Sequence, residues 1–212
     1  NVHFDGDTEG YIGFRSDENG KTQITFSMTN ATGCSGFQPA GSFCEDNMNG
    51  TMEVLLDHQI ALNHEYRLRI WSLQHPPGEE TRWGFFLKDM TKYPSIFENI
   101  KDENGTEEGV IYVGSIIARN ASVLTGGTTF VDFDGFSYSD MNCMPRTKAY
   151  FSTLTADHND PSRSFLERSV IDSMRTDSLL NTTFKRVTLN GIFEGVEIIS
   201  MFLFMECEII QF

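Results

Sequence analysis

The chain has 212 residues, of which 39% are hydrophobic, and its 18 phenylalanines supply enough apolar volume for a core. That length fits one large all-β domain or two small domains. The formal net charge is −14, and such an acidic surface repels both the phosphates of nucleic acids and anionic membrane surfaces. The composition therefore argues against both as partners.

The first elements in chain order predict a hairpin. Residues 11–14 open a strand, and residues 22–28 alternate between apolar and polar side chains. Residues 17–20 between them read Asp-Glu-Asn-Gly, a strong turn signal because Asn-Gly accepts positive φ. Residues 30–52 are rich in glycine and hold two cysteines, so we expect a long loop closed by a disulfide. A short strand follows at residues 52–56.

The strongest strand signal is a pair of alternating runs at residues 66–71 and 82–88. The break between them, residues 74–81, contains two prolines and a glycine that can continue neither strand nor helix. One face of the first run carries Arg67, Arg69 and Trp71. The opposite face carries Tyr66, Leu68 and Ile70, and one face of the second run carries Trp83, Phe85 and Leu87, so both runs are predicted to be half-buried strands.

The middle of the chain continues the strand pattern. Residues 110–117 form a near-continuous apolar run, typical of a strand buried on both faces. The glycine pair at 126–127 predicts a turn, and residues 128–138 and 147–154 predict further strands.

The C-terminal part contains the only helix signal, at residues 162–180, where a loop is the alternative. Residues 198–205 are very apolar, but a helix that spans a bilayer needs about 20 such residues. We therefore expect one or two central strands there and no membrane span. Taken together, the elements predict one all-β domain over residues 1–212, an antiparallel two-sheet β-sandwich with at most one short helix.

Five N-x-S/T sequons are present, whereas chance supplies roughly one or two in a chain of this length. The excess predicts a secreted, extracellular glycoprotein with sugar on at least three of the five asparagines. Asn30 and Asn49 are the first candidates because they flank the predicted cysteine loop. The five asparagines are Asn30, Asn49, Asn104, Asn120 and Asn181.

The four cysteines agree with an oxidising compartment, and four cysteines permit three pairings. We favour a short clip between Cys34 and Cys44. The second predicted bridge, Cys143–Cys207, would tie the C-terminal strand back to the domain. No cysteine or histidine spacing suggests a zinc site.

Two acidic stretches are candidate sites, first for calcium. Asp5, Asp7 and Glu9 resemble the start of an EF-hand loop, but Ser16 stands where the bidentate glutamate is required, so only a looser calcium site is possible.

The second acidic stretch contains Asp132 and Asp134, which share one face of a predicted strand. They are further calcium candidates. Paired carboxylates also serve glycoside hydrolysis, so the same pair is the candidate catalytic site if the chain is an enzyme. No other catalytic motif is present, and no other cofactor is expected.

Four residues of the first central run are candidates for binding sugar rings. Trp71 shares a face with Arg67 and Arg69, which makes it the best surface contact, and Tyr66 adds a second aromatic ring. For Trp83 we expect core packing, since its neighbours Phe85 and Leu87 are apolar.

Several strand motifs follow in an order that resembles a family of secreted domains of unknown function. The motifs are the Gly10-Tyr-Ile-Gly-Phe14 strand, the Ile24-Thr-Phe-Ser-Met28 strand, the Cys34–Cys44 loop, Tyr66-Arg-Leu-Arg-Ile70, Trp83-Gly-Phe-Phe-Leu-Lys-Asp89 and Tyr112-Val-Gly-Ser-Ile116. The resemblance covers about residues 10–155, and residues 181–212 match nothing in it. It implies a β-sandwich of jelly-roll type and supplies no catalytic residues.

Two functions of different class are compatible with these features. The leading expectation is a non-enzymatic extracellular glycoprotein module that binds glycans, or that joins other extracellular proteins or copies of itself in a matrix or filament. Self-assembly could use the apolar C-terminal strand to complete a neighbour's sheet, although filling its own core is the favoured role. The alternative is a secreted carbohydrate-active enzyme, a hydrolase or lyase, that uses Asp132 or Asp134.

Overall fold

The structure is a computed structural model that describes residues 1–16, 21–47, 50–74, 80–94, 108–129, 143–156, 169–170, 186–193 and 195–209. From residue 127 onward it describes the backbone alone. The strands are β1 (Val2–Phe4), β2 (Glu9–Ser16), β3 (Thr22–Met28), β4 (Ala31–Gly36), β5 (Phe43–Asp46), β6 (Met52–Asp57), β7 (Glu65–Gln74), β8 (Glu80–Asp89), β9 (Val110–Arg119), β10 (Leu124–Thr129), β11 (Cys143–Ala156), β12 (Ser169–Val170), β13 (Arg186–Phe193) and β14 (Gly195–Ile209).

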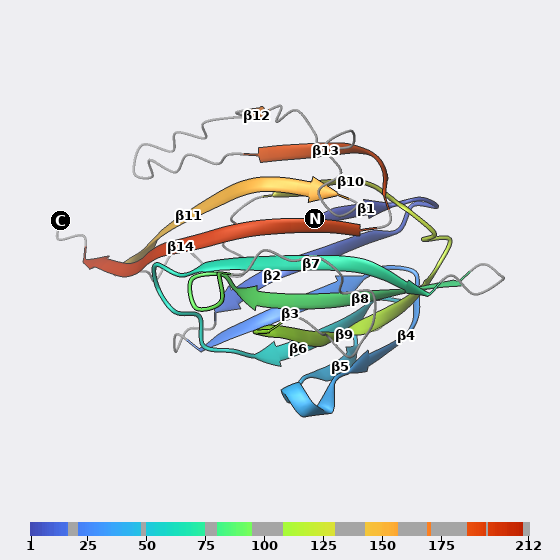
Figure 1. Cartoon of the computed structure of the whole chain (residues 1–212), viewed down its shortest axis with the longest axis horizontal. Coiled ribbons are helices and arrows are strands. Elements are labelled where there is room, and N and C mark those ends of the chain that lie inside the picture. Colours follow the sequence, from blue (N-terminus) through green and yellow to red (C-terminus); the bar gives the residue numbers. More distant parts are fainter. Residues whose placement is uncertain are drawn as a thin grey trace.

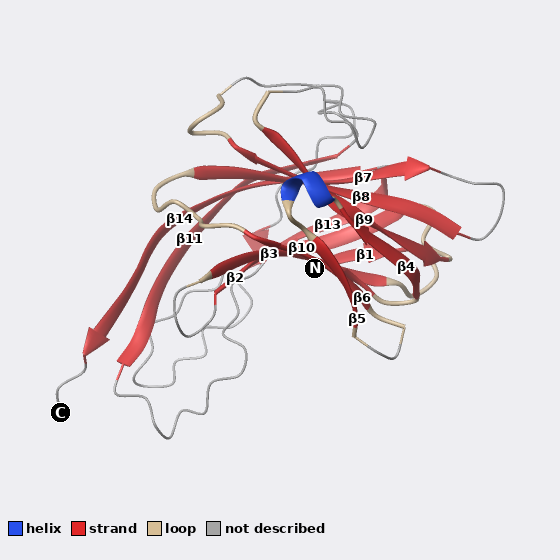
Figure 2. Ribbon diagram, turned by 90° about the horizontal axis from the view of Figure 1, so that it is seen from below, coloured by secondary structure: helices blue, strands red, loops and turns tan. Residues whose placement is uncertain are grey.

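Two antiparallel sheets pack against each other, which confirms the predicted all-β sandwich (Figures 1 and 2). Sheet A has eight strands in the order β12-β13-β10-β1-β2-β3-β6-β5. Sheet B has six strands in the order β11-β14-β7-β8-β9-β4. The two predicted hairpins are both present, as β2–β3 in sheet A and β7–β8 in sheet B.

The core lies between the sheets and contains the residues that the alternating runs predict. Phe26 of β3 meets Phe85 of β8 with ring centroids 5.6 Å apart. Trp83 is fully buried, packs edge-on against Phe4 at 4.9 Å, and donates a 2.7 Å hydrogen bond from Nε1 to the carbonyl of Ala121. Its indole therefore satisfies its one polar atom inside an apolar layer.

Sheet B is buried on its second face as well. Trp71, Phe86 and Tyr112 form a separate apolar cluster there, and the rings of Phe86 and Tyr112 lie 5.1 Å apart. Arg67 and Arg69 alternate with the core residues of β7 and are also buried. A strand buried on both faces loses the apolar–polar alternation as a guide to exposure.

The segment 30–52 is not the loop that its composition predicts. It forms β4, a short 3₁₀ turn η1 (Gln38–Ala40) and β5. Strand β4 consists of small residues and β5 of exposed ones, so neither shows an apolar pattern. The glycine turn predicted at 126–127 is wrong too. His3 and Val2 of β1 pair with Gly126 and Gly127, which places the glycines inside β10.

The predictions for the C-terminal part are partly wrong and partly confirmed. Of residues 162–180 the structure describes Ser169–Val170 alone, and this pair is strand β12, so the helix prediction is wrong at these two positions. Strand β14 pairs with β7 over Gly195–Met201 and with β11 along its length. Over Gly195–Met201 it therefore lies between two strands of its own sheet, as expected of a strand that fills its own core, while residues 202–209 pair with β11 alone. Figure 2 shows β11 and β14 running together past the other strands of sheet B.

Candidate functional site

The four residues predicted to bind sugar rings are not exposed. Trp71, Arg67 and Arg69 are at most 5% exposed on the second face of sheet B. Tyr66 is 1% exposed and points the other way, into the core between the sheets. The expected surface platform is therefore wrong, because the face of sheet B that carries Trp71 is buried.

The acidic candidates near the N-terminus have structural roles. The Asp5 carboxylate accepts hydrogen bonds from the Ser122 hydroxyl at 2.5 Å and from the Val123 amide at 3.0 Å. Asp7 occupies a turn with φ 58°, and Glu9 lies 3.7 Å from His3. Among the described residues, no three His, Cys, Asp or Glu side chains gather closely enough to hold a metal ion. Asp132 and Asp134 lie outside the described residues.

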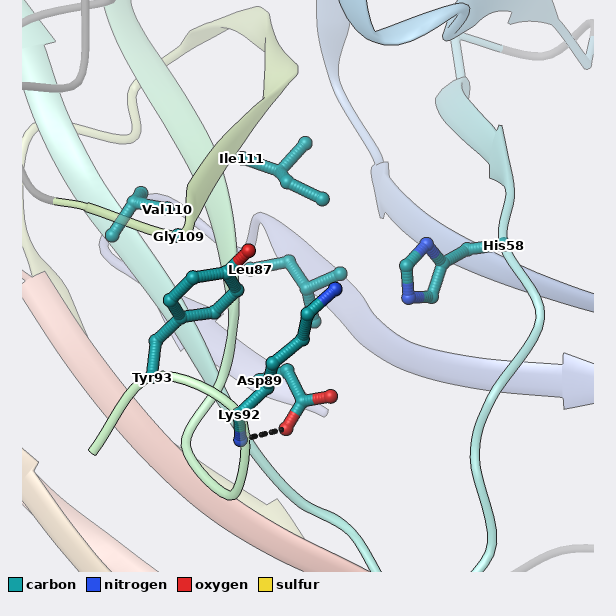
Figure 3. A pocket seen from close by; sticks show the side chains of 8 residues that line it. All are labelled: His58, Leu87, Asp89, Lys92, Tyr93, Gly109, Val110 and Ile111. Atoms are coloured by element: carbon teal, nitrogen blue, oxygen red, sulfur yellow. Dashed lines mark hydrogen bonds between the residues drawn. The ribbon is translucent and has the colours of Figure 1, made fainter.

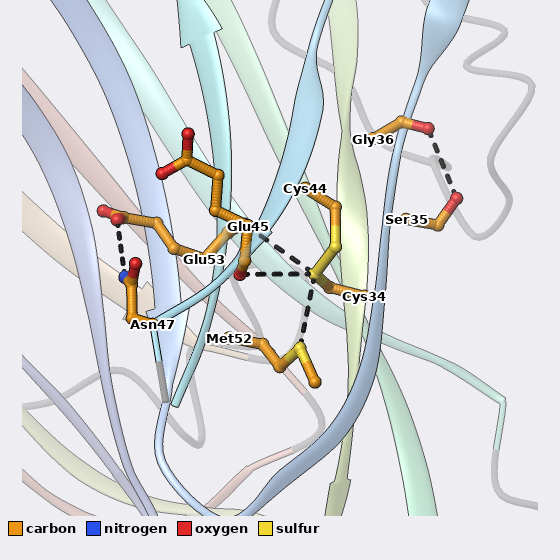
Figure 4. Close-up of a disulfide and its surroundings, with 8 residues drawn as sticks. All are labelled: Cys34, Ser35, Gly36, Cys44, Glu45, Asn47, Met52 and Glu53. Atoms are coloured by element: carbon orange, nitrogen blue, oxygen red, sulfur yellow. Dashed lines mark hydrogen bonds between the residues drawn. A yellow bond between two sulfur atoms is a disulfide. The ribbon is translucent and has the colours of Figure 1, made fainter. Parts of the chain in front are cut away.

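The disulfide predicted between Cys34 and Cys44 is present, with Cα atoms 5.8 Å apart (Figure 4). Cys34 belongs to β4 and Cys44 to β5, which are edge strands of sheet B and sheet A respectively. The bond therefore joins the two sheets along one side of the sandwich. A bridge of this kind is typical of proteins that fold in an oxidising compartment.

The backbone register brings the other two cysteines near each other without making them direct partners. Strands β11 and β14 are adjacent, and Cys143 pairs with Ile209 while Cys207 pairs with Pro145. The two cysteines are thus two register positions apart on neighbouring strands. The Cys143–Cys207 bridge stays a prediction.

Three of the five sequons gather at one end of the sandwich. Asn30 and Asn120 are both exposed and have positive φ, 54° and 50°. The Arg119 amide donates to the Asn30 carbonyl at 3.1 Å, and the Ala31 amide donates to the carbonyl of Gly50 at 2.9 Å. Gly50 is the middle residue of the Asn49 sequon. We call this the sequon end; Asn104, Asn181 and Asn49 itself lie outside the described residues.

A pocket of about 220 Å³ lies at the opposite end (Figure 3). Strand β9 starts beside the pocket at Val110 and ends at the sequon end at Arg119. These two residues are nine positions apart in an extended strand, and at about 3.3 Å per residue the two ends lie roughly 30 Å from each other. We call this the pocket end. The pocket takes residues from the β6–β7 connection, from β8, from both ends of the β8–β9 connection and from β9. It is lined by His58, Leu87, Asp89, Lys92, Tyr93, Gly109, Val110 and Ile111.

Asp89, the last residue of β8, organises the polar side of this pocket. Its Oδ1 accepts hydrogen bonds from the amides of Thr91 and Lys92, each at 3.0 Å. Its Oδ2 accepts from Nδ1 of His64 at 2.7 Å. Burial alone would raise the pKa of Asp89, but the His64 and backbone hydrogen bonds together hold it below its ordinary value. The carboxylate therefore holds the turn after β8.

His58 forms the far wall of the pocket. Its ring is half-buried and meets the ring of Tyr66 edge-on at 6.2 Å. Tyr66 in turn stacks on His64 at 6.3 Å, so one buried tyrosine separates the two histidines. Burial lowers the pKa of His58 below its ordinary value, while the nearby Asp89 carboxylate opposes that shift. A neutral imidazole, which can both donate and accept, follows near pH 7.

Tyr93 and Lys92 complete the pocket. The ring of Tyr93 lies on the backbone of Gly109, where a Cβ would come within 2.3 Å of it. The Lys92 ammonium lies 5.4 Å from the centre of that ring, and Figure 3 shows it between Tyr93 and His58. The pocket thus combines an apolar wall with three side-chain hydrogen-bond donors, the Lys92 ammonium, the His58 imidazole and the Tyr93 hydroxyl.

Sequence patterns missed this site because its residues come from three separate segments. Asp89 ends the Trp83 motif, and two of the histidines flank the turn before β7, but nothing in their spacing joins them. Only the fold places these residues within one pocket.

No family model, curated protein or solved structure matches the chain. The resemblance to secreted domains of unknown function over residues 10–155 stays a prediction. Among the described residues, no helix is long and apolar enough to cross a membrane.

Proposed function

We propose that this chain is a non-enzymatic extracellular glycoprotein module that binds glycans. The observation that carries the proposal is the disulfide between Cys34 and Cys44, which joins the edge strands of both sheets. Such a bond persists outside the reducing cytosol. The exposed sequon asparagines at one end of the sandwich support the same compartment.

The polar groups of the pocket support binding rather than catalysis. Glycoside hydrolysis uses two carboxyl groups, one of them free to give or take a proton. Asp89 is the only acid that lines the described pocket, and three donors already hold its carboxylate. A pocket with an apolar wall and a few polar groups at its edge suits a bound sugar.

A place in an extracellular matrix or filament belongs to the same proposal. In that role the module would bind the glycans of neighbouring proteins, and the part of β14 that pairs with both β7 and β11 serves its own sheet.

The test is a glycan array paired with a reducing-sugar assay, both on protein secreted from eukaryotic cells. The proposal predicts binding to some glycans and no release of reducing ends. Turnover of a bound glycan would make the chain a carbohydrate-active enzyme instead. Absence of binding across the array would remove the glycan-binding role.

A further inference from the structure

We propose that the pocket at the pocket end binds an acidic sugar, a pyranose ring that bears a carboxylate such as a uronic acid. Lys92 and His58 donate to the carboxylate, and Tyr93 packs on the ring. This inference rests on the proposed function, because it names the glycan class and the site where that glycan binds.

The size of the pocket limits what can bind in it. At about 220 Å³ the pocket is smaller than the roughly 300–1,000 Å³ typical for drug-sized ligands, so it fits one sugar ring rather than an oligosaccharide. The site lies at the pocket end, away from the exposed sequon asparagines Asn30 and Asn120.

Only some of the polar groups in the pocket are available to a ligand. Both oxygens of Asp89 are already hydrogen-bonded, to His64 on one side and to two backbone amides on the other. The ring nitrogens of His58 make no hydrogen bond to any described residue. The side-chain groups left to meet a ligand are thus the His58 imidazole, the Lys92 ammonium and the Tyr93 hydroxyl, and all three can donate hydrogen bonds.

The positive charge of Lys92 is available to a ligand. The chain has 30 acidic residues against 16 basic ones, so a lysine near the surface has many acids within reach. The ion pairs present among the described residues nevertheless do not include Lys92, whose ammonium lies over the Tyr93 ring instead. An ammonium held at a pocket by an aromatic ring favours an anionic ligand group.

The apolar wall of the pocket suits a sugar ring. The Tyr93 ring, Leu87 and Ile111 line the pocket beside the Lys92 ammonium and the His58 imidazole. Contact with the backbone of Gly109 fixes the position of the Tyr93 ring. A flat aromatic face packs well on the C–H face of a pyranose ring. An anionic group on a sugar ring matches both halves of the site, whereas a bare inorganic anion would leave the apolar wall unused.

The experiment measures the affinity of the secreted, glycosylated protein for methyl glucuronide and for methyl glucoside, which lacks the carboxylate. The inference predicts that the glucuronide binds roughly tenfold more tightly, the effect of one hydrogen bond to a charged group. Lys92→Gln should remove that preference, and Tyr93→Ala should weaken binding of both sugars. Lys21→Gln is the matched control, because it removes the same charge from a lysine that pairs with Asp57 outside the pocket.

The outcomes separate this inference from the proposed function. Equal affinity for the two sugars, or a preference that survives Lys92→Gln, overturns the acidic-sugar site while glycan binding stands. Loss of the preference in Lys21→Gln as well would assign it to general surface charge and also overturn the site. If the array shows no glycan bound at all, the proposed function fails first. Lys92 is exposed, so its variant keeps the test valid even if Tyr93→Ala does not fold.

Discussion

Tyr93 and Gly109 face each other across the two ends of the connection between β8 and β9. Gly109 has φ 77°, and a Cβ at this position would lie 2.3 Å from the Tyr93 ring. The glycine therefore meets two requirements at once, a left-handed backbone and room for an aromatic ring. One contact closes the connection and builds a wall of the pocket.

Replacing Gly109 tests this contact. We expect Gly109→Ala to lower the free energy of unfolding by about 2–4 kcal/mol, because backbone strain and displacement of Tyr93 add. Gly41→Ala is the control, since Gly41 has φ 79° but nothing within 4 Å of a Cβ. Gly41→Ala should lower the free energy of unfolding only by the backbone strain, about 1–2 kcal/mol. Equal losses in denaturant unfolding of the two variants would show that the Tyr93 contact contributes nothing.

The disulfide between β4 and β5 should stabilise the sandwich. For cysteines separated by 10 residues, we expect the double variant Cys34→Ser/Cys44→Ser to lose about 2–3 kcal/mol of unfolding free energy. Denaturant unfolding with and without reductant measures this. If the wild-type protein unfolds at the same denaturant concentration as the double variant, the bridge does not stabilise the fold.

The second predicted bridge has its own test. Peptide mapping of the unreduced protein should yield a linked pair that contains Cys143 and Cys207. Strands β11 and β14 lie side by side, and the two cysteines are diagonal neighbours, roughly 7–8 Å apart. A bridge therefore requires the two strands to move until these Cα atoms lie about 5.5–6 Å apart. Two alkylated thiols at these positions would contradict the prediction.

Asp89 should make stability depend on pH in the acidic range. Burial opposes ionisation, but the His64 and backbone hydrogen bonds outweigh it and lower the folded pKa. The stabilisation is therefore fully present above the ordinary aspartate pKa of about 3.9 and is lost as the pH falls through the lowered folded value. We expect Asp89→Asn to cost about 1–2 kcal/mol near pH 7 and almost nothing near pH 2. A constant loss at both pH values would rule out the carboxylate charge as the cause.

His58 should make stability depend on pH in a higher pH range than Asp89 does. Because burial lowers its folded pKa, the unfolded chain binds a proton at this residue more readily than the folded chain. Stability is therefore retained above about pH 6.5 and declines as the pH falls through the lowered folded value. In thermal melts between about pH 5 and pH 7, His58→Gln should flatten this decline. An unchanged slope would show that other groups cause it.

Sequence patterns predicted the strands whose two faces differ in polarity. The β7–β8 hairpin is the clearest case, since Leu68, Trp83 and Phe85 alternate with charged or less apolar neighbours and lie in the core. Exposure was harder to predict. Arg67 looked like a surface residue, but it is buried because the second face of sheet B is also covered.

Other features depend on contacts that no local pattern records. Strands β4 and β5 form because each pairs with a neighbour far along the chain or across a turn, at Cys34 with Ile116 and at Cys44 with Val54. Their small or exposed residues carry no strand signal of their own. The pocket is a similar case, since its walls meet only after both sheets have formed.

We propose above all that the chain is an extracellular glycoprotein, and the intact mass of the secreted chain tests this proposal most directly. Mass is measured before and after glycosidase treatment, followed by peptide mapping of each sequon. The account predicts a mass loss equal to at least three N-glycans, with Asn30 and Asn49 among the occupied sites. A secreted chain with its bare polypeptide mass and four alkylatable cysteines would contradict it.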